Sequence, residues 1–110
     1  MEIYARQGDV GIFRLTEAEV PEKLKAVKRD ARGRVVLAEG EVTGHFHAIA
    51  DQGVELYEVM GEVDRILRVT NTAGAAVVHD EHATIDLPKG NYRVVIQSEY
   101  SPEAIRRVVD

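Results

Sequence analysis

All four histidines of the chain fall into two short clusters, and their chemistry stands out from the rest of the sequence. One residue separates His45 from His47, and two separate His79 from His82. On an extended strand, side chains two residues apart project from the same face, so both rings of the first pair point one way. At the second pair, a strand end and turn can curl both rings toward one point. Each neutral imidazole offers a nitrogen lone pair to an ion of the zinc type.

The sequence therefore predicts a site for one divalent transition-metal ion, with His45, His47, His79 and His82 as its ligands. Four imidazoles would close such a site, whereas three would leave one position for water or a carboxylate. Imidazole ligands favour Zn, Ni, Cu or Fe over Mg or Ca, and we expect an ion of the zinc type. The prediction requires that the two clusters meet in the fold. If they do not, the histidines are pH-sensitive hydrogen-bonding groups.

Carboxylates flank both clusters. Glu39 and Glu41 precede the first, and Asp80 and Glu81 lie inside the second. A carboxylate at such a place can complete the coordination, orient an imidazole, or act as a general base beside a metal-bound water. Glu81 is the predicted catalytic base, because it is held between two candidate ligands. Solvation at the surface explains each of these acids equally well.

Composition excludes several other classes of site. The chain has no cysteine, which rules out a disulfide framework, a thiol nucleophile and Cys-ligated metals. Its serines, Ser98 and Ser101, lie near the C-terminus without the surroundings of a nucleophilic serine. The nine glycines are scattered singly, so no phosphate-binding loop is present, and kinase, NTPase and dinucleotide-binding functions are excluded.

The elements that must position the histidines are mostly predicted to be short strands. With 110 residues, 45% of them hydrophobic and 30% charged, the chain is expected to form one globular domain spanning residues 1–110. Apolar and β-branched runs separated by turn residues predict a mainly β fold, a small antiparallel barrel or sandwich. The predicted strands are Gly8–Leu15, Arg34–Ala38, His45–Ala50, Val54–Met60, Arg65–Thr70, Ala75–His79 and Tyr92–Ser98.

Connections and helices complete this prediction. Asp51-Gln-Gly53 predicts a hairpin between the third and fourth of those strands. Thr16–Lys28 predicts a short helix with a capping box from Thr16 to Glu19, shortened or broken at Pro21. A short C-terminal helix is expected after Ser101, with its apolar stripe at positions 105, 108 and 109.

Charge and hydropathy limit the classes of partner that the chain could have. The N-terminus lacks the apolar core of a signal peptide, and no apolar run could span a bilayer, so we expect a cytoplasmic protein without membrane association. The net charge of −5 disfavours nucleic acid as a partner overall. One basic stretch nevertheless leaves phosphate contact open. It holds six of the fourteen lysines and arginines: Lys23, Lys25, Lys28, Arg29, Arg32 and Arg34.

Two resemblances add to these expectations. Gly40-Glu-Val-Thr-Gly-His-Phe-His47, followed by Leu87-Pro-Lys-Gly-Asn-Tyr92, partly resembles the two cupin motifs, which implies a β-barrel metalloenzyme. Asp51 stands where cupins have Glu, and Arg93 where they have His.

Over nearly its full length, the chain also resembles a family of small bacterial and phage-encoded proteins of unassigned function. The shared pattern is Gln7-Gly-Asp-Val10, Val35–His47, His79-x-x-His82 and Gln97-Ser-Glu-Tyr-Ser-Pro-Glu103. This resemblance implies that both histidine clusters belong to one recurring design.

Three functions remain open at this stage. The first is a metal-binding protein in which the ion is structural or activates water. The second is a metal-dependent hydrolase or cupin-like enzyme, with Glu81 or Glu41 as its base. The third is a non-catalytic, oligomer-forming subunit of a larger bacterial or phage assembly, docking through its terminal helix or an exposed strand edge.

Overall fold

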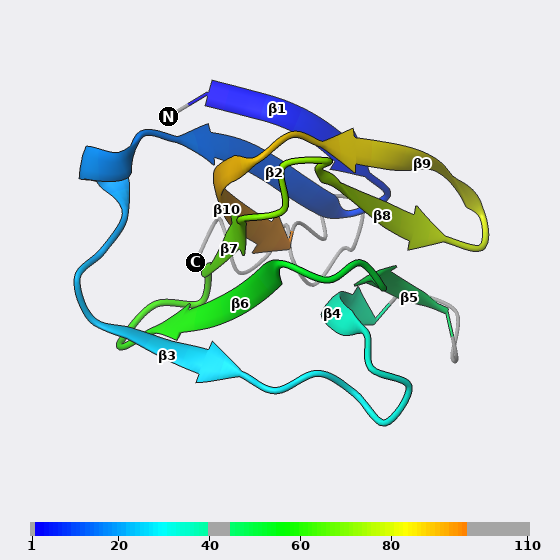
Figure 1. The fold of residues 1–110 in the computed structure, drawn as a ribbon, viewed down its shortest axis with the longest axis horizontal. Helices are drawn as coiled ribbons and strands as arrows, with labels where there is room; N and C mark the ends of the chain where they lie inside the picture. The colour runs from blue at the N-terminus through cyan, green and yellow to red at the C-terminus, as the bar shows by residue number, and fades with distance from the viewer. Residues whose placement is uncertain (1, 40–44, 97–110) are drawn as a thin grey trace, which may run out of the picture.

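The computed structural model describes residues 2–39 and 45–96, which form two antiparallel sheets (Figure 1). The larger sheet has six strands in the order β1-β2-β10-β7-β6-β3, and the smaller has four in the order β4-β5-β8-β9. The strands of the larger sheet are β1 (Glu2–Gln7), β2 (Val10–Leu15), β10 (Gly90–Ile96), β7 (Arg65–Val69), β6 (Val54–Val59) and β3 (Leu24–Val27). Those of the smaller sheet are β4 (Val35–Glu39), β5 (Phe46–Ile49), β8 (Ala75–His79) and β9 (His82–Leu87).

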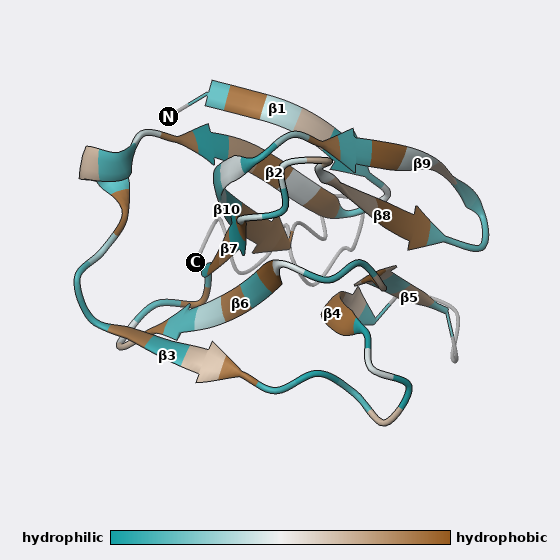
Figure 2. Cartoon of the chain, in the orientation of Figure 1, coloured by the Kyte–Doolittle hydropathy of each residue, from teal (hydrophilic) through white to brown (hydrophobic). Residues whose placement is uncertain are grey.

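Apolar side chains from both sheets meet in one core, which gives the molecule a sandwich-like arrangement. Ile12 of β2 and Leu67 of β7 are fully buried in the same cluster as Leu37 of β4 and Val77 of β8. A smaller cluster of Leu15, Val59 and Ile66 extends the core on the larger sheet. In Figure 2 the strands carry most of the hydrophobic colour, while the long connection between β3 and β4 is mostly hydrophilic. Burial of apolar side chains at about 1.5–3 kcal/mol each is what holds the two sheets together.

The mainly β, antiparallel prediction is confirmed, with two refinements. The sheets are open and do not close into a barrel within the described residues, because β1 and β3 are the two ends of the larger sheet. The described residues contain ten strands, including β1, β3 and β9, which the sequence did not reveal. Strands β1 and β9 have no clear signal in the sequence because most of their side chains are exposed. They therefore lack the apolar run of an interior strand.

The helix predicted over Thr16–Lys28 is wrong beyond its first turn. A 3-10 turn, η1 (Glu17–Glu19), forms there, and the backbone N–H of Thr16 donates to the Glu19 carboxylate at 2.8 Å, as a capping box requires. The chain then becomes extended at Val20 and enters β3. Pro21 accounts for the stop, because it disfavours helical backbone in the residue before it.

The hairpin predicted at Asp51-Gln-Gly53 is also wrong. Strand β5 pairs with β4 and β8, whereas β6 pairs with β3 and β7, so the connection carries the chain from one sheet to the other. Gly53 has a φ of 69°, and its carbonyl accepts hydrogen bonds from the backbone N–H groups of Thr70 and Asn71. These turn residues thus hydrogen-bond the connection between β5 and β6 to the loop after β7.

The helix expected after Ser101 lies outside the described residues. Among the residues that are described, there is no helix of sufficient length and apolarity to cross a bilayer.

Candidate functional site

The four histidines lie together at one end of the smaller sheet. His47 is in β5, His79 ends β8 and His82 begins β9, while His45 directly precedes β5. In Figure 1 the β8–β9 turn, the start of β5 and the β1–β2 turn all lie in the right-hand half of the view. The two clusters predicted from the sequence therefore meet in the fold.

Strand register explains why three of the rings line up. Ala48 of β5 pairs with Val78 of β8, so one step along this antiparallel pair His47 comes opposite His79. His79 in turn pairs with His82 across the β8–β9 turn. Directly opposed residues on antiparallel strands have their side chains on the same face and in contact. The pairing thus builds a row of imidazoles across three strands.

The ring spacings show how close this row is. The ring centroids of His47 and His79 are 4.2 Å apart, and those of His79 and His82 are 4.7 Å apart. His47 and His82 stand 6.0 Å apart with nearly parallel rings. His45 meets His79 edge-on at 5.9 Å. Every ring thus has another within 6.0 Å, and we call these four side chains the histidine cluster.

A buried glutamine fixes the state of His47. The side-chain amide of Gln7, at the end of β1, donates to the backbone carbonyls of Val77 at 3.0 Å and Ala83 at 2.9 Å. Both amide hydrogens are then used, so Oε1 of Gln7 faces Nδ1 of His47 at 2.8 Å as an acceptor. Nδ1 must therefore carry the proton, and the lone pair of the neutral ring is at Nε2.

Burial keeps that ring neutral. His47 is 1% exposed, and burial lowers its pKa from 6.5 to about 4, with positive charge on His79 adding to the effect. His82 acts in the same direction, while the carboxylate of Asp9 opposes the change. A neutral ring with its lone pair at Nε2 is the form in which histidine binds a metal.

Carboxylates hold the outer part of the histidine cluster. The Glu81 carboxylate accepts a hydrogen bond from Nδ1 of His45 at 3.0 Å, and Oδ2 of Asp80 lies 3.7 Å from Nε2 of the same ring. The backbone N–H of Glu81 donates to Nδ1 of His79 at 3.1 Å. Glu81 therefore contacts a histidine from each predicted pair, the His45 contact through its side chain. The structure shows it orienting an imidazole, and its predicted role as a catalytic base stays a prediction.

The β1–β2 turn closes the cluster from the side. Gly8 has a φ of 58°, a backbone conformation that favours glycine. A Cβ at Gly8 would lie 2.8 Å from Nε2 of His82 and 3.3 Å from Cε1 of His47. The turn can approach the two rings this closely only because Gly8 has no side chain.

The donor atoms of the cluster do not yet share a centre. Within residues 2–39 and 45–96, no group of three or more histidine, aspartate or glutamate side chains is already arranged to hold a metal ion. The rings are neighbours, but part of their lone-pair capacity is engaged in hydrogen bonds, as at His79.

Other candidate residues from the sequence lie apart from this cluster. Glu41 falls outside the described residues, and Glu39 is exposed at the end of β4. Asp51 accepts a hydrogen bond from the backbone N–H of Ala76, and Arg93 binds Glu62 at 2.9 Å, so the two residues at cupin motif positions have other partners.

Two cations of the basic stretch make internal contacts. Arg29 donates to the backbone carbonyls of Gly33, Asp51 and Val54. Arg34 pairs with Asp30 at 2.9 Å. These two guanidinium groups are engaged within the chain, which weakens the case for a phosphate-binding arm.

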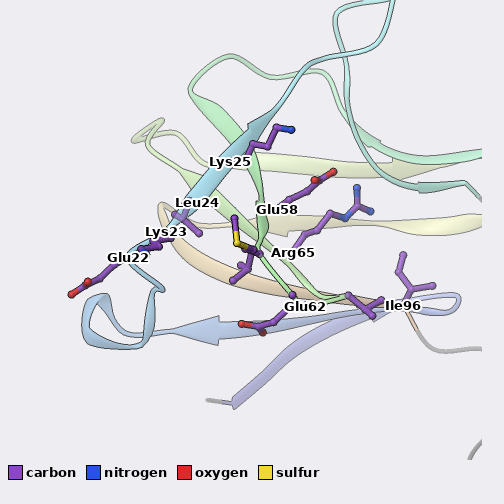
Figure 3. Close-up of a pocket in the computed structure, with 12 residues that line it drawn as sticks. Glu22, Lys23, Leu24, Lys25, Glu58, Glu62, Arg65 and Ile96 are labelled. Carbon is purple, nitrogen blue, oxygen red and sulfur yellow. The ribbon is translucent and has the colours of Figure 1, made fainter.

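An open groove of about 940 Å³ lies along β3 and the β6–β7 turn, away from the histidines (Figure 3). Met60 and Val63 are 88% and 92% exposed in its lining, beside both acidic and basic side chains. The groove carries no group with evident catalytic chemistry.

Sequence reasoning misses Gln7, Gly8 and Asp9 as parts of the site. The sequence places Gly8 and Asp9 at the start of a predicted strand, and it gives no structural role to Gln7. The available signal is the Gln7-Gly-Asp-Val10 string, which the resemblance described above groups with the histidine motifs. Only the pairing of distant strands places that turn against the imidazoles.

Comparison with known proteins identifies the family. A family model described as a domain of unknown function, DUF8820, matches residues 6–97, and the chain belongs to this family. Neither a curated protein nor a solved structure matches the chain.

Proposed function

We propose that this member of a family without an assigned activity binds one transition-metal ion of the zinc type at the histidine cluster. His45, His47, His79 and His82 are the candidate ligands. Imidazole nitrogen is a preferred ligand of Zn²⁺ and a poor one for Mg²⁺ or Ca²⁺.

The observation that carries the proposal is the hydrogen-bond chain from Gln7 to His47. Histidines that bind metals generally donate their second ring N–H to a carbonyl or carboxylate, which fixes the tautomer and the ring orientation. Gln7 does this for His47, because its own amide is locked by two backbone carbonyls. Glu81 does the same for His45. Two of the four rings, His45 and His47, are therefore held with the lone pair of Nε2 available to a metal ion.

The spacing of the rings supports a shared ion. With Zn–N bonds of about 2.0–2.1 Å, two imidazoles on a tetrahedral ion have ring centroids about 5 Å apart. The neighbouring rings of the histidine cluster are 4.2 to 6.0 Å apart, on both sides of this value. Side-chain rotations at Cβ, with little movement of the strands, would bring their nitrogens to one point.

His79 is the ligand that must change most. Its Nδ1 accepts the Glu81 backbone N–H, so its lone pair is already in use. Coordination through Nδ1 would occupy that lone pair, and coordination through Nε2 would place the proton on Nδ1. Either way, the Glu81 N–H loses its acceptor if His79 joins the ion. The Glu81 amide therefore reports whether the site has His79 as a ligand.

This distinction separates the two roles open to the metal. A site with all four imidazoles is closed and structural, whereas a site without His79 keeps a position for water. In the open form, Glu81 and Asp80 are the carboxylates near the exposed side of the site. A water bound there would be a better nucleophile, because zinc lowers its pKa toward neutrality.

The test is a Zn²⁺ titration of tag-free, chelator-stripped protein by calorimetry. We expect one Zn²⁺ per chain, and at least tenfold weaker binding in His47→Asn and His82→Asn. His82 is exposed, so its variant should keep its fold even if the buried His47 variant does not. A Gln52→Asn variant, at an exposed turn residue, should bind as the wild type does.

Two results would overturn the proposal. The first is wild-type protein that shows no saturable Zn²⁺ binding. The second is folded His82→Asn and His47→Asn variants that both bind Zn²⁺ as tightly as wild type. In parallel, the ¹⁵N–¹H spectrum follows the Glu81 amide. A large shift and faster hydrogen exchange on adding Zn²⁺ indicate the closed site, and an unchanged Glu81 amide indicates the open one.

A further inference from the structure

A carboxylate on the β1–β2 turn faces the available nitrogen of His47. Oδ1 of Asp9 lies 3.6 Å from Nε2 of His47, and the Asp9 side chain is only 17% exposed. This separation is too long for a direct hydrogen bond between them. The same ring donates its Nδ1–H to Gln7, so its neutral form has no proton at Nε2 to offer Asp9.

Two lone-pair donors thus face each other across a short gap in a largely buried place. Such an arrangement is unfavourable unless a cation or a hydrogen-bond donor such as water lies between them, because buried electron-rich atoms repel at low dielectric. The separation suits an ion: with bonds of about 2.0–2.1 Å to nitrogen and oxygen, a tetrahedral zinc site has neighbouring donors roughly 3.4 Å apart.

The neighbouring turn brings a second imidazole to the same point. Gly8 precedes Asp9, and a Cβ there would touch both Nε2 of His82 and Cε1 of His47, the carbon next to its Nε2. The edges of these two rings therefore converge on the turn that carries the Asp9 carboxylate. His79, by contrast, is held by Glu81 with its lone pair in use.

We propose that Asp9 is itself a ligand of the metal. It binds the ion together with His47 and His82 and takes the place of His79. This inference rests on the proposed metal-binding function and deepens it. A set of two imidazoles and one carboxylate suits Zn²⁺ or Fe²⁺ better than the softer Cu⁺. With His45 as a further ligand this site is closed, and without His45 one position stays free for a water or for an oxygen atom of a substrate.

The test compares Asp9→Asn with Asp86→Asn in calorimetric Zn²⁺ titrations. Both changes remove one negative charge by replacing a carboxylate with an amide, but Asp86 is exposed and lies toward the opposite end of β9 from His82. We expect Asp9→Asn to weaken Zn²⁺ binding at least tenfold and Asp86→Asn to stay within about threefold of wild type. Thermal melting in the presence of a chelator checks that both variants fold.

The outcomes separate this inference from the function on which it rests. If wild type and Asp9→Asn bind Zn²⁺ equally while His82→Asn does not, the histidine site stands and Asp9 is not a ligand. If both Asp variants lose affinity to the same extent, the effect is one of net charge, and the assignment of Asp9 fails as well. If wild type does not bind Zn²⁺, both proposals fall together.

Discussion

At the scale of single residues, the chemistry of the cluster depends on one amide. Gln7 is 2% exposed and donates both its amide hydrogens to strands β8 and β9, which leaves only its oxygen for His47. The ring could otherwise carry its proton on either nitrogen. A glutamine in a β-strand thus decides which atom of a histidine is available for chemistry.

Replacing this glutamine tests that dependence. Gln7→Met keeps the size of the side chain but removes its hydrogen bonds to the carbonyls of Val77 and Ala83 and to the Nδ1–H of His47. At about 1–3 kcal/mol for a buried polar group left unpaired, we expect a loss of roughly 2–4 kcal/mol in the free energy of unfolding. Urea denaturation measures the loss, and ¹⁵N shifts of the imidazole report a mixed tautomer in place of a single one.

Gln52→Met is the matched control. Gln52 is exposed in the crossover between β5 and β6, and the same substitution there should change the free energy of unfolding by less than about 0.5 kcal/mol. Equal effects of the two substitutions, or an unchanged His47 tautomer in Gln7→Met, would show that the amide has no control over the ring.

At the scale of elements, the sequence is informative wherever a strand is buried and silent about which strands pair. Ala75–His79 is predicted with the bounds that the structure shows, because its β-branched and small apolar residues fit an interior strand. The sequence does not predict β9, because the mostly exposed residues of this strand carry no apolar pattern.

No local pattern in the sequence predicts that the two histidine clusters meet. The clusters are brought together where β5 pairs with β8, in the register that sets Ala48 opposite Val78. A shift of this pairing by one residue would send His47 to the other face. The convergence is therefore set by packing of the whole core, in which strands far apart in the chain take part.

The connection between β3 and β4 offers a test at this scale. Arg29 donates to three backbone carbonyls, two of them on the chain that crosses between the sheets, at Asp51 and Val54. A lysine has one ammonium in place of a forked guanidinium and cannot satisfy all three. We expect Arg29→Lys to lower the free energy of unfolding by about 1–3 kcal/mol in thermal or urea denaturation.

Arg32→Lys serves as the comparison, because Arg32 is an exposed cation of the same segment. It should cost less than about 0.5 kcal/mol. If the two variants are equally stable, the segment is a solvated arm and does not fasten the crossover. If Arg29→Lys is as stable as wild type, the Arg29 guanidinium of the wild-type protein counts again among the cations available for phosphates.

At the scale of the whole molecule, the buried imidazole couples folding to pH. Folded His47 resists protonation down to a pKa of about 4, whereas the unfolded chain takes up that proton at about 6.5. Between these values protons bind the unfolded state preferentially. The stability contributed by neutral His47 is therefore fully present above pH 6.5 and is lost as the pH falls toward 4.

The size of this effect is set by the same two values. At 1.36 kcal/mol per pH unit of differential protonation, His47 should remove about 1–2 kcal/mol from the free energy of unfolding between pH 7 and pH 5. That window keeps most carboxylates ionised, so the change is dominated by histidine. The measurement is urea denaturation at a series of pH values, with a chelator present to keep metal out of the comparison.

His47→Asn isolates the contribution of this ring. Its overall stability is expected to be lower, but its loss of stability between pH 7 and pH 5 should be smaller than that of wild type by about 1–2 kcal/mol. Parallel pH profiles for the two proteins would mean that the ring takes up its proton without unfolding. Because His47 must be neutral to bind a metal, added Zn²⁺ should steepen the wild-type profile and leave that of His47→Asn nearly unchanged.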